Sequence, residues 1–355
     1  MKINNLNSRV VFLITVVAIL LLPVMTHAVS NGAVLFLLIE PGSRPGSMGK
    51  AFVAQADDGF AGYWNPGAMA FNRKTQLAAM HSNWFGDVSG IDDIYYEYLG
   101  WNKYFQDYGN LGASFTYLSY GDIQETSADG EDLGSFSSYE LAITFNYGYQ
   151  LTENLGLGTN FKFVWSDLAP QNAGGHNTSE RGRGITYGFD FAVKHKNILI
   201  DKLDFGLNLQ NVGPDVTYVD KEQSDPMPMN WRMGLSYRLL DSKLNKLTIN
   251  TDINKELEND DFVLARIATA WFDDDLNQEL ESIIYSFGTE YIYYDILSLR
   301  AGYIIDKAGD FEGPSFGAGF HYTLNNRYRF RIDFAFEQAG ELTDYNKTYS
   351  LGVDF

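Results

Sequence analysis

Cysteine is absent from the 355 residues of the chain, and histidine occurs only five times. Without cysteine there are no disulfides, no thiolate metal sites and no thiol nucleophile. The histidines show no metal-ligand spacing, and they are His27, His81, His176, His195 and His321. The glycine pairs at Gly156/Gly158 and Gly317/Gly319 open no helix, so they are not phosphate-binding loops. We therefore expect no catalytic residue, no metal and no cofactor, and we do not expect an enzyme.

Basic residues are also few, because 26 Lys and Arg stand against 45 Asp and Glu. The resulting net charge of −19 argues against a nucleic-acid partner, since phosphates require a basic face. Acidic residues gather between the apolar stretches, as in Asp122, Glu125, Asp129, Glu131 and Asp132. This placement fits solvated loops.

Long hydrophobic runs are missing after the first 28 residues, so no later segment could cross a membrane as a helix. Residues 1–28 have the pattern of an export signal. Lys2 and Arg9 give its positive start, Val10 to Val24 its apolar stretch, and Thr26-His27-Ala28 its small-residue cleavage site. A retained anchor helix is the alternative, but the run is short and wrongly flanked for one.

What the chain does have is a repeated alternation of apolar and small or polar residues. From Arg183 to Lys194 the odd positions are Ile185, Tyr187, Phe189, Phe191 and Val193, and the even positions include Gly188 and Asp190. Such a strand has one apolar face and one polar face. The polar face carries too much glycine and charge to form a soluble core, so the pattern indicates a transmembrane β-barrel facing lipid. The 23 Tyr and 25 Phe fit its aromatic girdles.

The alternation predicts an all-β, 14-stranded antiparallel barrel over residues 73–355. Strands are expected at 75–83, 93–101, 108–120, 136–150, 155–166, 183–195, 202–212, 229–240, 246–255, 282–292, 296–306, 314–324, 328–338 and 347–355. The connections after odd-numbered strands are long, and those after even-numbered strands are short. This asymmetry is typical of outer-membrane barrels, with long extracellular loops and short periplasmic turns. An even strand count then places both termini in the periplasm.

One long connection, 256–281, contains a helical pattern. Val263, Ile267, Ala270 and Trp271 fall on one helix face, and Asn259 to Asp261 supply capping side chains before it. We interpret it as an extracellular helix with an apolar stripe. Either the barrel rim and neighbouring loops or a partner must cover that stripe.

Residues 29–72 do not alternate and are rich in Gly, Ala and Pro. They are too apolar to hang in the periplasm, so we expect them to fold into the periplasmic mouth as a hatch or plug. Room for such a plug is one explanation of the strand glycines, and relief of strand curvature is the other; these glycines are Gly156, Gly158, Gly188, Gly206, Gly234, Gly302, Gly317 and Gly319. Inward charges are expected to form ion pairs that stabilise a filled lumen, and they are Arg232, Arg238, Arg300, Arg329, Arg331, Asp190, Asp252, Glu290 and Asp333.

Several motifs together resemble the PorV/PorQ family, whose members are relatives of the FadL long-chain fatty-acid channels. The hatch motif comprises Met48, Gly49, Asp57, Asp58, Trp64, Asn65 and Pro66, and later motifs include Asn208 to Gly213, Pro226 to Arg232, Asn250 to Lys255, Trp271 to Asp273 and Leu299 to Tyr303. One departure is Gly67, where the family usually has Ala. The order and spacing of the motifs cover nearly the whole chain after the signal.

The resemblance implies a cell outer-membrane component of type IX protein secretion, in contact with outer-membrane lipid. Its implied partners are an SprA-type translocon, a sortase-containing attachment complex and the C-terminal domains of secreted proteins, which it would bind and shuttle. The alternative is a FadL-like channel for long-chain fatty acids or other hydrophobic small molecules. In the shuttle, contacts are expected in connections 121–135, 167–182, 213–228 and 256–281. Within the last connection, the candidate partner-binding residues are Val263, Ile267, Trp271 and Phe272.

Overall fold

The computed structural model describes residues 32–83, 93–126, 129–130, 132–169, 182–218, 224–259, 261–273, 275–338 and 345–355. The expected export signal, residues 1–28, lies outside the described residues. So do the connection 84–92 and most of the connections expected at 167–182 and 339–346.

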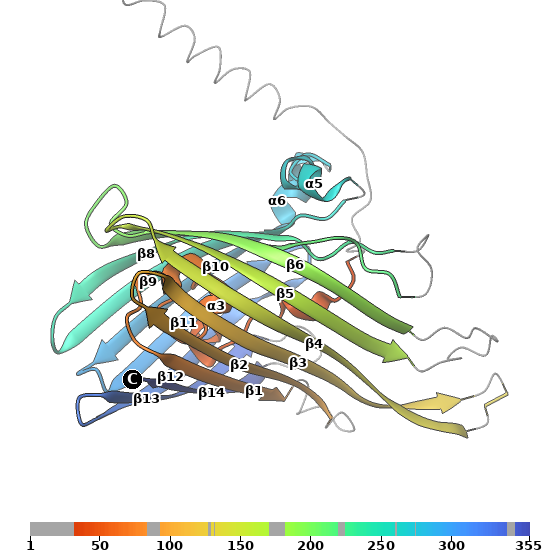
Figure 1. The fold of residues 1–355 in the computed structure, drawn as a ribbon, viewed down its shortest axis with the longest axis horizontal. Coiled ribbons are helices and arrows are strands. Elements are labelled where there is room, and N and C mark those ends of the chain that lie inside the picture. The colour runs from red at the N-terminus through yellow and green to blue at the C-terminus, as the bar shows by residue number, and fades with distance from the viewer. Residues whose placement is uncertain are drawn as a thin grey trace, which may run out of the picture.

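Fourteen antiparallel strands close into one barrel, in which sequential strands are neighbours and β1 pairs with β14 (Figure 1). The fourteen-stranded prediction is confirmed. Closure leaves no strand edge exposed, which a lipid environment requires. The strands are β1 (Gln76–Asn83), β2 (Ile94–Phe105), β3 (Gly109–Thr126), β4 (Asp132–Gln150), β5 (Leu155–Ala169), β6 (Gly182–His195), β7 (Leu203–Val212), β8 (Asn230–Asp241), β9 (Asn245–Glu256), β10 (Ile283–Tyr293), β11 (Leu297–Asp306), β12 (Phe311–Leu324), β13 (Tyr328–Gln338) and β14 (Tyr345–Asp354).

The apolar side chains of the strands face outward and the polar ones face the lumen. In β6, Ile185 and Phe191 are 51% and 53% exposed, while Thr186 and Asp190 between them are 5% and 0% exposed. This is the reverse of a soluble protein, and it fits a wall whose outer face meets lipid. Among the described residues, no helix is long and apolar enough to span a bilayer.

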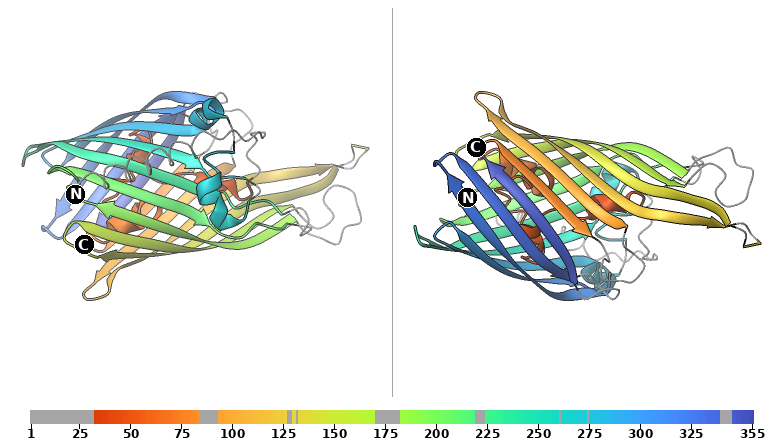
Figure 2. Two further views of the ribbon diagram at one scale, coloured as in Figure 1. Left: turned by 90° about the horizontal axis from the view of Figure 1, so that it is seen from above. Right: turned by 90° about the horizontal axis from the view of Figure 1, so that it is seen from below.

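The long loop expected at 121–135 is wrong, because β3 continues to Thr126 and β4 begins at Asp132. Figure 2 shows this hairpin reaching farther than the other strands. A shift of register between Ser119 and Asp122 bends it, with Gly121 at φ +75°, a conformation that glycine adopts without strain. The extension carries polar residues on both faces. The backbone pairing of the two strands therefore continues beyond the point where apolar and polar residues stop alternating.

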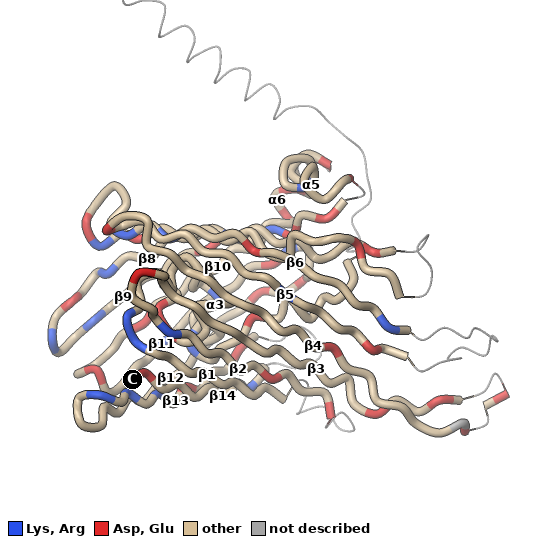
Figure 3. The backbone as a smooth tube through the Cα atoms, in the orientation of Figure 1, with Lys and Arg blue, Asp and Glu red and all other residues tan. Residues whose placement is uncertain are grey.

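The two ends of the barrel differ in their connections and in their charge. By the strand bounds, every connection after an odd-numbered strand is longer than those on either side of it. The expected connection 307–313 is shorter than predicted, because β12 begins at Phe311. Lys and Arg gather at the end with the short connections (Figure 3). The C-terminal residue, Phe355, lies at this short-connection end, where its backbone pairs with Thr75.

Residues 33–72, which we call the plug segment, run through the lumen (Figure 1). The segment contains four short helices, η1 (Leu35–Leu38), α2 (Ser43–Gly46), α3 (Ala61–Trp64) and α4 (Pro66–Met69). Asn65 caps α4 by accepting from the Ala68 amide, and Pro66 occupies its first turn, a position where its missing N–H costs nothing. Met48, Phe52, Trp64 and Met69 are at most 1% exposed, so the plug segment and the polar wall form a single core.

The path of the plug segment differs from the expected position in the mouth at the short-connection end. The Ala33 amide donates to the Pro226 carbonyl in the connection after β7, which is a long connection. The chain therefore enters the lumen at the long-connection end and leaves it near Thr75 at the opposite end. The plug segment occupies the length of the lumen rather than the mouth at the short-connection end. Strand parity alone did not reveal this, because the plug segment precedes β1.

The strand glycines fit around the plug segment. A Cβ added at Gly302 would collide with the backbone of Met48 and Gly49, and one at Gly206 with the backbone of Val53. Gly156 and Gly158 face plug backbone at Pro66 and Gly67, and Gly317 faces the Ser47 side chain of the plug segment. The explanation that strand glycines leave room for a plug therefore holds for these positions. Gly188, Gly234 and Gly319 instead face Met227, Asp252 and Asp333.

Gly302→Ala is expected to destabilise the barrel by about 1–3 kcal/mol, because its methyl group overlaps backbone that has no rotamer to change. Gly352→Ala is the matched control, because its Cβ would lie 3.2 Å from Nε of the flexible Arg331 side chain. The measurement is the temperature at which the folded, fast-migrating species disappears from a semi-native gel. Equal temperatures for the two variants would contradict the close fit.

Candidate functional site

The plug segment is tied to the wall by an arginine whose fork is fully used. In Arg44, Nε and Nη2 donate to the two carboxylate oxygens of Glu290 at 2.9 and 2.7 Å. Its Nη1 donates to Asp57 at 2.5 Å and to Asp58 at 3.1 Å, both within the plug segment. Burial alone would lower the pKa of Arg44, but Asp57, Glu290 and Asp58 outweigh it and hold that pKa well above its ordinary value.

Glu290 continues this network into the wall. Its Oε1 also accepts from Nε of Arg300 on β11 at 2.7 Å, and Arg300 Nη1 donates to Asp333 on β13 at 2.7 Å. Glu290 is 1% exposed. A buried carboxylate between two arginines is stable only while both remain, since losing either partner leaves uncompensated charge. We call Arg44, Glu290, Arg300 and Asp333 the lumen ion-pair network.

Polar wall side chains satisfy the irregular backbone of the plug segment. Asp252 Oδ2 accepts from the amides of Phe52 and Val53 at 2.7 and 2.9 Å. Asn208 Nδ2 donates to the carbonyls of Tyr63 and Trp64 at 3.1 and 3.0 Å. Backbone groups buried away from water need such partners, so the polar lumen and the plug segment depend on each other.

The residues of the predicted hatch motif all lie in the plug segment and contact the wall or one another. Met48 and Gly49 pack against β10 and β11, and Asp57 and Asp58 bind Arg44. Trp64 Nε1 donates to the Pro41 carbonyl at 2.8 Å. Asn65 Nδ2 bridges the carbonyls of Val53 and Val193, which belong to the plug segment and to β6.

The sequence interpretation missed Glu40 and Arg44, the two plug residues with the most ion-pair contacts. Arg232 and Lys50 both bind Glu40, the latter at 2.7 Å. Burial works to raise the pKa of Glu40, but Lys50 and Arg232 lower it below its ordinary value. Both residues are charged and lie in a Gly- and Pro-rich apolar segment that was already expected to be inside the barrel. A charge inside the barrel without a partner in its own segment was the signal that could have identified them.

The expected pairing of inward charges is confirmed for most of them. Arg232 binds Glu40, Arg238 binds Asp204, Arg331 binds Asp354, and Asp190 binds Lys162 at 2.9 Å. Arg329 instead contacts His321, 2.9 Å from its Nη2. Over the described ranges, no group of three or more His, Asp or Glu is arranged to hold a metal ion.

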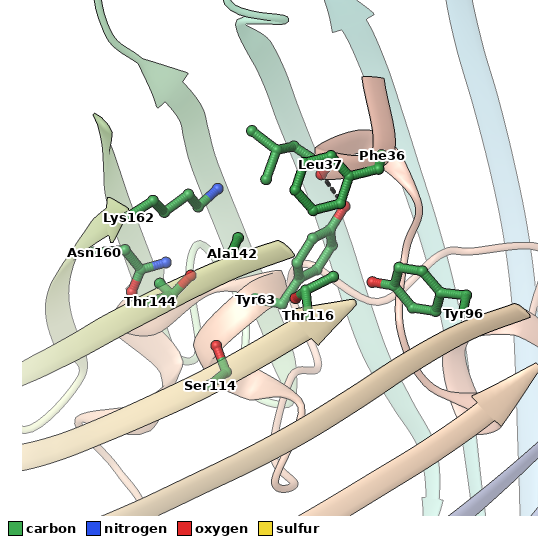
Figure 4. A pocket seen from close by; sticks show the side chains of 10 residues that line it. All are labelled: Phe36, Leu37, Tyr63, Tyr96, Ser114, Thr116, Ala142, Thr144, Asn160 and Lys162. Atoms are coloured by element: carbon green, nitrogen blue, oxygen red, sulfur yellow. Dashed lines mark hydrogen bonds between the residues drawn. The ribbon is translucent and has the colours of Figure 1, made fainter. Parts of the chain in front are cut away.

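The plug segment packs closely against β3 to β5. The remaining cavity there measures about 10 Å³, which is room for about one water molecule. Figure 4 shows Tyr63 and Phe36 of the plug segment pointing into it, opposite Asn160 and Lys162 of β5, with Tyr63 Oη donating to the Leu37 carbonyl at 3.1 Å.

Larger spaces lie at the long-connection end. Two cavities of about 430 and 170 Å³ share Leu38, Glu40, Lys50, Glu256 and Phe311 in their linings. We call the two together the mouth chamber. Its floor is the plug segment, and its walls are the ends of β1 and of the strands from β8 to β14.

The connection after β9 forms two short helices, α5 (Val263–Thr269) and α6 (Leu276–Glu281), rather than one longer helix. Its apolar stripe packs on the outer wall of the barrel rim, where Trp271 stands edge-on to Trp231 with ring centroids 5.0 Å apart. Lys255 of β9 also binds Glu279 of α6 at 2.8 Å. The expected capping by Asn259 to Asp261 is wrong, because the N-cap is Phe262, whose side chain makes no capping bond.

The structure thus covers Val263, Ile267 and Trp271 with the molecule's own rim. Phe272 follows them and is half-buried. The apolar side chains of these two helices that remain open are others, with Phe262, Leu264 and Leu276 at 73%, 60% and 68% exposure.

Comparison with known proteins gives a family and a fold. A family model described as type IX secretion system protein PorV matches residues 24–260. Among solved structures, the Ralstonia pickettii toluene transporter TbuX aligns with a TM-score of 0.52 at 12% identity, covering 90% of this chain and 99% of that one. The monoaromatic hydrocarbon channel CymD gives 0.49 at 13% identity, covering 89% and 97%. No curated protein sequence matches the chain. At such low identity, the structural likeness shows a shared FadL-like fold and nothing more.

Glu290→Gln is expected to destabilise the folded barrel by about 3 kcal/mol or more, because two buried arginines lose their shared counter-charge. The matched control is Glu97→Gln, which removes an ion pair with His81. The side chains of Glu97 and His81 are 42% and 53% exposed. That change should cost at most about 0.5 kcal/mol. Both are measured as the melting temperature of the heat-modifiable form, and a small effect of Glu290→Gln would contradict the network.

Trp271→Ala is expected to lower stability by about 3 kcal/mol, because it removes the ring that packs on Trp231. Phe262→Ala is the control, because its side chain is 73% exposed and has little packing to lose. The readout is again the melting of the folded species. Unchanged stability of Trp271→Ala would show that the stripe does not fix the helices to the rim.

Proposed function

Because the chain belongs to the PorV family of type IX secretion system proteins, we propose that it binds the C-terminal signal domains of secreted cargo in the outer membrane. It carries them from an SprA-type translocon to a sortase-containing attachment complex. The closed barrel and the family place the chain in the outer membrane. We assign the long-connection end to the cell exterior, following the loop asymmetry of such barrels.

The observation that carries this proposal is the fixed plug segment. The lumen ion-pair network, the wall side chains on the plug backbone and the fit of Gly206 and Gly302 hold residues 43–65 at many points. A protein whose lumen is filled in this way acts by its surface. That suits a carrier that hands proteins between complexes better than it suits a solute channel.

We place the cargo and partner contacts on the rim at the long-connection end. The stripe residues Val263, Ile267 and Trp271 seat the two rim helices on the wall. Seated there, the helices present Phe262 and Leu264 outward as apolar anchors. The projecting β3–β4 hairpin and residues 213–218 and 224–229 of the connection after β7 flank the same end, whereas residues 170–181 lie outside the described chain.

A FadL-like channel for hydrophobic molecules is the second candidate, and one observation favours it. The mouth chamber has an apolar wall made by Leu35, Leu38, Ile39 and Phe311. For transport, the plug segment would have to move away from the wall. The two functions therefore differ in whether the plug segment must move.

A disulfide between the plug segment and β14 separates the two. Ser43 and Ser350 have their Oγ atoms 2.8 Å apart, and the chain has no other cysteine to interfere. The double variant Ser43→Cys/Ser350→Cys is introduced into a strain lacking the gene, with each single variant as control. In that strain, cargo with type IX C-terminal domains should stay in the periplasm. The locked variant should restore its export as well as the reduced one does.

Two results would contradict the shuttle. Export that stops when the disulfide forms and resumes on reduction would show that the plug segment must move. Normal export in the deletion strain, together with lower uptake of long-chain fatty acids or hydrocarbons, would establish the channel instead.

A further inference from the structure

The mouth chamber is a built cavity rather than a gap between loops. Its lining comes from strand ends, with Glu256 closing β9, Asp306 closing β11 and Phe311 opening β12. The plug residues Leu35 and Leu38 form the apolar side. Leu35 is 45% exposed, so the chamber opens to solvent at the end where we place the cell exterior.

The chamber has an excess of carboxylates. Its two cations, Lys50 and Arg232, both bind Glu40. Three further carboxylates, those of Glu256, Asp306 and Glu337, line the chamber, and none belongs to an ion pair among the described residues.

The hydrogen-bond donors that contact Glu337 and Asp306 are neutral. Thr348 Oγ1 donates to Glu337 at 2.6 Å, and the Gly309 amide donates to Asp306 at 2.9 Å. The chamber therefore retains acceptors that a positively charged group would satisfy, and it disfavours an anion.

Buried amide oxygens add to this demand for donors. Asn230 and Asn254 line the smaller part of the chamber and are 2% and 7% exposed. The Oδ1 atom of each has no hydrogen-bond partner. The Asn230 amide nitrogen is used by Gln210, which fixes its oxygen as the unused atom. Unsatisfied buried acceptors are costly, and an N–H-bearing ligand would relieve them.

We infer that the mouth chamber binds an ammonium or guanidinium group carried on an apolar stem, the chemistry of a lysine or arginine side chain. The charged end lies among Glu256, Asp306 and Glu337, and the stem lies against Leu38 and Phe311. The inference does not rest on the proposed role in secretion, because it uses only the lining of the chamber. The same chemistry occurs in a protein segment and in a small amphiphilic amine.

The test uses the full mature chain in lipid nanodiscs, with empty nanodiscs subtracted, and titration calorimetry of charge-matched probes. Hexylamine should bind about tenfold or more tightly than hexanoate. The double variant Glu256→Gln/Glu337→Gln should lose that preference. Glu312→Gln, an exposed acid beside Phe311, should keep it. Semi-native gels confirm that each variant is folded.

Two peptides separate the sources of the ligand. Acetyl-Leu-Lys-Leu-amide binding more tightly than hexylamine, with acetyl-Leu-Glu-Leu-amide not binding, identifies a protein segment. Hexylamine binding more tightly than the lysine peptide identifies a small amine. Hexanoate binding as well as hexylamine to the unaltered chain would overturn the inference, as would the failure of both cationic probes to bind.

Discussion

The carboxylate of Glu290 joins two arginines that lie on opposite sides of the boundary between the plug segment and the wall. Arg44 approaches from the lumen and Arg300 from the neighbouring strand. Neither arginine could be buried without this counter-charge, and the carboxylate could not be buried without them. The ion pairing continues on both sides of Glu290, because Arg44 also binds Asp57 and Asp58, and Arg300 also binds Asp333. The plug segment and the barrel are therefore one folded unit, and the lumen of this FadL-like barrel is mostly protein interior.

The sequence predicted the wall well because lipid imposes a strict rule on it. A strand that crosses a bilayer must alternate, and every strand bound except the end of β3 was predicted to within four residues. Alternation is required only where a strand lies within the membrane. The polar β3–β4 extension obeys only backbone pairing, and its residues looked like a loop. The first strands alternate weakly, but their pairing with β14 and β3 holds them in the barrel.

The plug segment could be predicted to exist but not to take its observed path. Its contacts join residues far apart in the chain, such as Arg44 with Glu290 and Phe52 with Asp252, and no periodicity reports them. The glycines gave a hint, since those facing Met48, Val53 and Gly67 lie where the plug backbone approaches most closely. For the rim helices, the stripe of Val263, Ile267 and Trp271 was visible in sequence. Only the structure shows that this stripe lies against the outer wall and leaves Phe262 and Leu264 open.

The plug segment is as firmly folded as the wall around it. Amide hydrogen exchange of the barrel in nanodiscs measures this directly, residue range by residue range. The amides of Phe52 and Val53, which donate to Asp252, and those of residues 43–69 should exchange as slowly as the amides of β10 and β11. Exchange of the plug segment within seconds, while the strands stay protected, would show a mobile hatch and contradict a firmly folded plug segment.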